Sequence, residues 1–114
     1  METKLVKQTN YYTYRITWSE EDKEYVGLCA EFPSLSWLGK TQDAALHGIH
    51  KLVTGVVLDM QSNNETIPHP LALTRFSGKF MVRIPPHVHR ELSIQAAEAK
   101  VSINRIVSAK LSIV

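Results

Sequence analysis

The sequence predicts an α+β protein: a small three-stranded antiparallel sheet plus helix, followed by a strand-helix-helix segment that dimerises. Three observations lead to this prediction. Three short strand-like runs lie between residues 12 and 38, an apolar stripe with helical spacing follows over residues 42–61, and a strand with two helices occupies the last third of the 114 residues. We expect a first domain over residues 1–61, a linker over 62–75 and a second domain over 76–114.

The first three elements are predicted to be strands. The first has a period of two, in which aromatic and β-branched residues alternate with polar ones: Tyr12, Thr13, Tyr14, Arg15, Ile16, Thr17 and Trp18. A charged turn over residues 20–23 leads to a second apolar run, Tyr25 to Ala30, so that the two form a hairpin. Pro33 then interrupts the chain, and Leu35 to Leu38 is long enough for a third strand.

A long helix is predicted from about Gln42 to Gln61. Thr41 offers a side-chain oxygen to cap its first turn, and Asp43 suits the positive end of the helix. Apolar residues then recur at spacings of three and four: Ala45, Ile49, Leu52, Val53, Val56 and Met60. This stripe predicts a two-layer unit in which one helix covers the sheet. Beyond it, polar residues and two prolines over residues 61–70 remove the periodicity and predict the linker.

The last third of the chain predicts a strand and two helices. Phe80, Val82 and Ile84 alternate with Lys79, Met81 and Arg83 in a strand that ends at Pro85. Pro86 fits the first turn of a helix, along which Val88, Leu92, Ala96 and Ala99 form a stripe. Ser102 is a favourable N-cap for a second helix, with its own stripe of Ile103, Val107 and Leu111.

A single strand in so short a segment predicts a dimer. One strand has unpaired backbone groups on both edges, and about forty residues bury too little apolar surface for a stable core. Two copies solve both difficulties if their strands pair antiparallel and place Phe80, Val82 and Ile84 under the helices. Lys79, Met81 and Arg83 then stand outward from a two-stranded ribbon, which fits the DNA major groove.

Charge and composition agree with this division. The net charge of +2 is too small to indicate nucleic-acid binding alone, but residues 75–110 hold seven Lys or Arg against two acidic residues. Cys29 is the only cysteine, so an internal disulfide is excluded, and we expect a buried, unreactive thiol. The sequence contains no apolar run of membrane-spanning length and no secretory signal pattern. We therefore expect a soluble, cytoplasmic protein with no membrane contact.

Catalytic and metal-binding patterns are weak. His47 and His50 lie three residues apart on the long helix, but no third ligand is evident nearby, so we expect solvent-facing histidines and no metal. The acidic residues crowd one turn at residues 20–24 or lie scattered, and no nucleophile-base pair or phosphate-binding glycine loop occurs. We expect a protein that is not an enzyme and needs no cofactor.

Two motifs carry a family resemblance. The run SGKFMVRIP from Ser77 to Pro85, followed by a helix and then Val101-Ser102-Ile103-Asn104, resembles the ribbon-helix-helix domains of Arc- and MetJ-type repressors. It is more similar still to the version fused to HicB-type antitoxins. The front segment agrees, because Tyr25-Val26-Gly27-Leu28, Phe32-Pro33 and Gly39-Lys40-Thr41 resemble the degraded RNase H-like front domain of that family.

The resemblance implies a function for each domain. The front domain would bind and silence a HicA-type toxin, a small ribonuclease that attacks messenger RNA. The ribbon-helix-helix dimerisation domain would bind operator double-stranded DNA as a homodimer, or as a tetramer of two dimers on adjacent half-sites. Lys79, Met81 and Arg83 would read bases, while Ser102, Ile103 and Asn104 would hold a DNA phosphate at a helix N-terminus. Trp37 is the expected anchor for the partner, since aromatic residues dominate interface hot spots.

The chain departs from the family pattern at one position with a physical consequence. Glycine is common before the serine of the second helix, where this chain has Lys100. If that position is left-handed, lysine costs roughly 1 kcal/mol relative to glycine. Two further departures, both in the front segment, lie at Pro33-Ser34-Leu35 and at Asp43-Ala44-Ala45.

Three alternatives remain open from the sequence. The chain could be a stand-alone ribbon-helix-helix repressor whose front domain binds a small ligand or another protein, which a pocket lined by Tyr12, Tyr14 or Trp18 would favour. It could also be an oligomerisation protein that binds no DNA. The third alternative is a nuclease, which would require metal-dependent cleavage.

Overall fold

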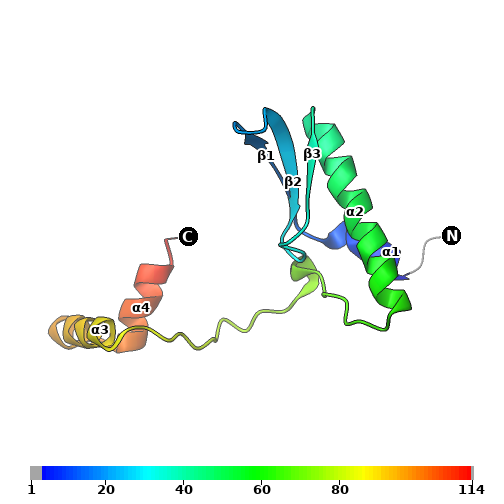
Figure 1. The fold of residues 1–114 in the computed structure, drawn as a ribbon. Coiled ribbons are helices and arrows are strands. Elements are labelled where there is room, and N and C mark those ends of the chain that lie inside the picture. Colours follow the sequence, from blue (N-terminus) through cyan, green and yellow to red (C-terminus); the bar gives the residue numbers. More distant parts are fainter. Residues whose placement is uncertain (1–3, 114) are drawn as a thin grey trace. The chain divides into compact units, whose positions relative to one another are not determined.

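The computed structural model describes residues 4–113, which divide into two compact units between Phe76 and Ser77 (Figure 1). The first unit contains α1 (Lys4–Gln8), a 3₁₀ turn η1 (Thr9–Tyr11), strands β1 (Tyr14–Ser19), β2 (Glu24–Cys29) and β3 (Ser36–Gly39), helix α2 (Gln42–Ser62) and a 3₁₀ turn η2 (Leu71–Leu73). The second unit contains α3 (Pro86–Ala99) and α4 (Ile103–Leu111). The predicted α+β class, with a three-stranded antiparallel sheet and a covering helix, is confirmed.

The sheet has the order β1-β2-β3, with both neighbouring pairs antiparallel. Tyr14 pairs with Cys29 at one end of the hairpin and Ser19 with Glu24 at the other. The first strand begins two residues later than the alternation indicated. Tyr12 instead lies before the strand, almost fully buried, with its ring edge-on to Phe32 and its hydroxyl donating to the carbonyl oxygen of Pro68 at 2.7 Å.

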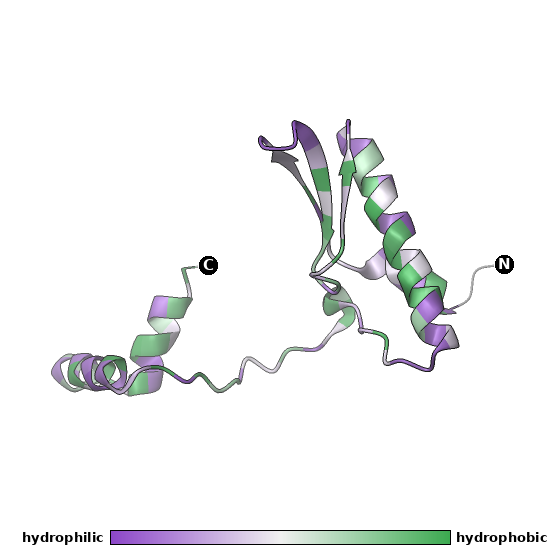
Figure 2. Cartoon of the chain, in the orientation of Figure 1, coloured by the Kyte–Doolittle hydropathy of each residue, from purple (hydrophilic) through white to green (hydrophobic). Residues whose placement is uncertain are grey.

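Helix α2 covers one face of the sheet and supplies most of the core. Three residues of the predicted stripe, Ala45, Ile49 and Val53, are fully buried, and so is Val57, which the stripe did not include. The other three, Leu52, Val56 and Met60, are only partly buried and pack against this core. Figure 2 shows hydrophobic and hydrophilic residues intermixed along the whole of α2. Thr41 caps it, because the hydroxyl accepts from the Ala44 N–H at 3.0 Å. Gly27 and Gly39 allow its close approach, since a Cβ on either would lie 2.6 Å or less from the backbone of Ala45.

The connection after α2 folds back onto the first unit. Pro70 is fully buried, and the carboxylate of Glu31 accepts from the N–H of Leu71 at 3.0 Å and from the N–H of Thr13 at 2.8 Å. Burial raises the pKa of the Glu31 carboxyl, but the hydrogen bonds from Leu71 and Thr13 outweigh it, and the net pKa is lowered. Residues 67–74 are therefore held against the end of the sheet by Glu31 and Tyr12.

The N-terminal turn, which the periodicity did not indicate, packs against the middle of α2. Thr9 is fully buried; its hydroxyl donates to the carbonyl oxygen of Val6 at 2.6 Å and lies 3.3 Å from the hydroxyl of Thr54. Short helices of this kind form through tertiary contacts rather than through their own propensity.

In the second unit, the two helices begin where the sequence predicts. Pro86 occupies the first turn of α3, and Lys100 at its end is left-handed, with φ 57° and ψ 41°. The N–H groups of Lys100 and Val101 donate to the carbonyl oxygens of Ala97 and Ala96, a Schellman motif that closes the helix. Ser102 then caps α4 as predicted, its hydroxyl accepting from the N–H of Arg105 at 3.1 Å.

The expected strand over residues 79–84 is absent from the single chain. Residues 79–84 are in neither helix nor strand. The physical reason is that a strand is defined by its hydrogen-bonded partner, and the described chain offers these residues none. Ribbon pairing between two copies therefore stays a prediction.

Candidate functional site

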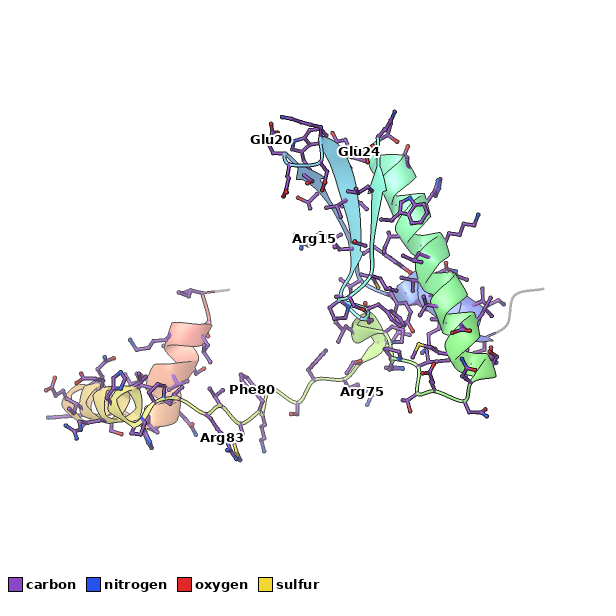
Figure 3. The ribbon with its side chains drawn as sticks, viewed as in Figure 1. Arg15, Glu20, Glu24, Arg75, Phe80 and Arg83 are labelled. Atoms are coloured by element: carbon purple, nitrogen blue, oxygen red, sulfur yellow. The ribbon has the colours of Figure 1, made fainter. Side chains whose placement is uncertain are left out.

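Residues 79–84 expose all their apolar side chains. The exposed fractions are 76% for Phe80, 87% for Met81, 58% for Val82 and 40% for Ile84. Figure 3 shows Phe80 and Arg83 on this stretch of chain, outside any helix or strand. Isolated exposed apolar side chains are ordinary, but four within five residues form a surface that is unfavourable in water.

The segment is introduced by a tight turn at Ser77 and Gly78. Gly78 has φ +79°, a conformation that glycine adopts without strain, and a Cβ there would meet nothing within 4 Å. The hydroxyl of Ser77 accepts from the N–H of Lys79 at 3.0 Å. The turn therefore fixes the backbone at the start of the segment while leaving the side chain of Lys79 exposed.

The basic side chains of this segment have no acidic partner within the described residues. The ion pair within residues 4–113 joins Lys23 to Glu20, at the tip of the β1-β2 hairpin in the first unit. Lys79 and Arg83 are both exposed and form none. Their charges are therefore available to an anionic ligand.

The start of α4 places the three predicted phosphate-contacting residues side by side. Ser102 uses its hydroxyl oxygen as the cap, as described above. Ile103 and Asn104 are the first two residues of the helix, so their N–H groups have no acceptor within it. The side chain of Asn104 is exposed. An anion at this end would meet two free N–H groups and the positive end of the helix dipole.

Trp37 lies on β3 with 47% of its surface exposed. Its indole ring packs on Gly48 of α2, where an added Cβ would lie only 1.9 Å from the ring atom Cδ1. Trp37 also lines a shallow groove along α2 with Gly48, Lys51, Leu52, Gly55 and Asp59. The apolar periodicity of α2 did not indicate the role of Gly48, although a glycine inside a helical stripe is a recognisable sign of close approach.

Other candidate residues are engaged in structural contacts. His50 lies 2.9 Å from the Oδ1 atom of Asn10 through its Nε2 atom, whereas His47 is exposed. Within residues 4–113, no three His, Cys, Asp or Glu side chains come together as metal ligands would. Cys29 is buried as expected, its thiol donating to Glu31, and burial raises its pKa.

Neither of the two grooves found along α2 is lined by the aromatic residues that would favour a small ligand, namely Tyr12, Tyr14 and Trp18. Over residues 4–113, no helix combines the length and the hydropathy needed to cross a membrane.

Comparison with known proteins gives one match. The model of the HicB family matches residues 62–111, a little under half of the chain, and covers residues 79–84 and both helices of the second unit. No curated protein and no solved structure matches significantly. Residues 62–111 of this chain are therefore similar to the HicB family.

Proposed function

We propose that this chain is the antitoxin of a type II toxin–antitoxin pair. It neutralises a HicA-type mRNA interferase by direct binding and represses its own operon by placing a dimeric ribbon in the DNA major groove. It acts in the cytoplasm through binding alone, without catalysis. The observation that most supports this proposal concerns residues 79–84, whose apolar side chains at every second position are exposed in the single chain. The two helices that follow them lie in the part of the chain that the family match also covers.

The second unit needs a partner to complete its core. Ala96 is the one apolar residue of this unit that is buried among the described residues. Large apolar side chains remain exposed in the same unit: Phe80, Met81, Val82, Ile84, Ile94, Leu111 and Ile113. Antiparallel pairing of two copies of residues 79–84 satisfies the free backbone groups and buries Phe80, Val82 and Ile84 under the four helices.

The same pairing produces a surface for reading DNA. Side chains alternate across a strand, so burying the even-numbered residues leaves Lys79, Met81 and Arg83 pointing outward on both copies. Arg and Lys donate to guanine acceptors in the major groove, and an apolar side chain fits a thymine methyl group. The free N–H groups of Ile103 and Asn104 then hold a backbone phosphate and set the orientation.

The DNA part is tested by binding to a duplex of the gene's upstream region across a salt series, compared with random duplex. Arg83→Ala is expected to cost roughly 1–3 kcal/mol of specific binding, because it removes a base contact. Lys110→Ala is the matched control, since it removes an exposed positive charge in the last turn of α4, outside the segment of residues 79–84. Equal losses in both variants would mean that the ribbon does not read sequence.

The front unit is proposed to bind the toxin through its strands and α2, with Trp37 as the anchor. Half-exposed aromatic side chains held rigidly by the fold are favoured at interface hot spots, and the packing on Gly48 holds the ring in place. Trp37→Ala is expected to weaken toxin binding by at least tenfold in calorimetry. Trp18→Ala is the matched control, since Trp18 is equally exposed, at 46%, on another strand. Unchanged affinity in Trp37→Ala removes the anchor.

A further inference from the structure

Gly55 is a glycine that its own unit does not require. It lies exposed in the interior of α2, and a Cβ added there would meet nothing within 4 Å. This distinguishes it from Gly48, where Trp37 fills the space. Alanine at such a position would stabilise the helix by about 1 kcal/mol relative to glycine. A glycine that no intramolecular contact explains allows another backbone to approach α2 from outside.

Gly55 is also at the centre of a hollowed surface. It lines the groove that Trp37 borders on one flank of α2, and it lines a second groove on the other flank, towards Val6 and Asn10. Leu52 and Val56 are only half-buried, and Leu58 is 44% exposed, so that apolar side chains accompany Gly55 on this part of the helix. The surface therefore has grooves beside a residue without a side chain, together with apolar side chains, and a second helix can pack into such a surface.

Two opposite charges flank Gly55 symmetrically. Lys51 lies four residues before it and Asp59 four residues after it, about 6 Å away along the helix axis in each direction. Residues spaced by four lie on the same side of a helix, and all three line the same groove. Both charged residues are exposed, and neither forms an ion pair within residues 4–113.

This symmetry identifies the occupant. We propose that the front units of two copies pair through α2, antiparallel and centred on Gly55, with Lys51 of each copy facing Asp59 of the other. An antiparallel copy brings each lysine opposite an aspartate, twice, whereas a parallel copy would bring like charges together. The contact is isologous and closes on two chains. It is distinct from the ribbon and does not depend on it.

The pairing leaves the proposed toxin anchor at its margin. Packed helices commonly cross at about 50° and diverge on either side of the contact. Trp37 packs on Gly48, which lies seven residues, or about two turns, from Gly55. Toxin binding and α2 pairing therefore have separate central residues and can be tested with separate variants.

The test measures association by sedimentation velocity in a chain whose ribbon is blocked by Val82→Asp, a change in an exposed segment outside the front unit. That variant is expected to remain dimeric through α2. Adding Lys51→Glu places like charges together twice and is expected to give a monomer. Adding Asp59→Lys as well exchanges the two charges and is expected to restore the dimer. Lys40→Glu, an exposed charge reversal before α2, is the control and leaves the dimer intact.

Three outcomes would overturn the pairing: a monomeric Val82→Asp chain, a dimer that survives addition of Lys51→Glu, or a charge exchange that fails to restore association. Lys51→Glu alone, with the ribbon intact, is expected to stay dimeric. If instead that single variant is monomeric, the ribbon is refuted and the α2 pairing is not.

Gly55→Leu gives an independent readout in the ribbon-blocked chain. Leucine favours helix over glycine, and its Cβ at this exposed position would meet nothing within 4 Å, so the melting temperature is expected to rise or stay unchanged. The same side chain separates the two helices, so the dimer is expected to weaken at least tenfold. A stable chain with undiminished association contradicts the proposal.

Discussion

Phe80→Ala is expected to weaken the ribbon dimer, and the structure sets the magnitude. Phe80 is 76% exposed in the single chain, and full burial of such a side chain contributes about 1.5–3 kcal/mol. Burying the exposed three quarters therefore contributes roughly 1–2 kcal/mol per copy and roughly 2–4 kcal/mol per dimer. The dissociation constant is expected to rise roughly 30- to 1,000-fold, measured by sedimentation equilibrium. For this measurement the α2 surface is blocked by Lys51→Glu, so that the measured dissociation constant is that of the ribbon dimer alone.

Met81→Ala is the control that makes this measurement decisive. Met81 is still more exposed, at 87%, but it lies on the alternate face and is predicted to point away from the dimer core. Its loss is expected to leave association unchanged and to weaken DNA binding. Equal weakening by both variants would refute the alternation on which the ribbon rests.

The remaining predictions concern single residues. Lys100→Gly is expected to raise the stability of the second unit by roughly 1 kcal/mol in thermal melts, because the position is left-handed; an unchanged or lower stability would disprove that. Ser102→Ala removes the cap that accepts from Arg105 and is expected to cost about 0.5–2 kcal/mol, while Ser102→Gly costs only a few tenths. Glu31→Gln is expected to speed hydrogen exchange of the Leu71 amide. Folding lowers the pKa of Glu31, so its ionised carboxylate contributes to the free energy of unfolding. This contribution is fully present above the pKa of an unfolded glutamate, about 4.3, and is lost as the pH falls through the pKa of Glu31 in the folded chain.

Glu65→Gln is the matched control for the Glu31 substitution. Glu65 is exposed in the same connection after α2, and its side chain makes no hydrogen bond within residues 4–113. In the Glu65→Gln variant, hydrogen exchange of the Leu71 amide and the pH dependence of stability are expected to match those of the unmodified chain. If Glu31→Gln behaves in the same way, the carboxylate does not hold the connection.

The elements with strong local signals were predictable from the sequence. The spacing of Ala45, Ile49 and Val53 located α2, and the residues that begin α3 and α4 were identified because caps and proline act within one turn. The contacts of Tyr12 were not predictable, since the side chain bonds to Pro68, which lies 56 residues away. The fold-back of residues 67–74 was not predictable for the same reason, because it depends on the long-range hydrogen bonds of Tyr12 and Glu31.

The candidate site was predictable as a pattern but not as a geometry. Alternation identifies Lys79, Met81 and Arg83 as one face, and this face exists only once a second strand defines it. Gly48 and Gly55 could be told apart only in the structure, since the space beside Gly48 is filled by Trp37 and the space beside Gly55 is open.

Amide hydrogen exchange at residues 80–84, followed as the protein is diluted, tests the central claim most directly. Pairing predicts slow exchange at alternate amides of this segment at concentrations where the chain is dimeric, because ladder hydrogen bonds protect them. Protection should disappear on dilution together with the dimer, while the core amides of α2 stay protected. Fast exchange of all these amides in a chain that sedimentation shows to be associated, with the α2 surface blocked, would contradict the ribbon.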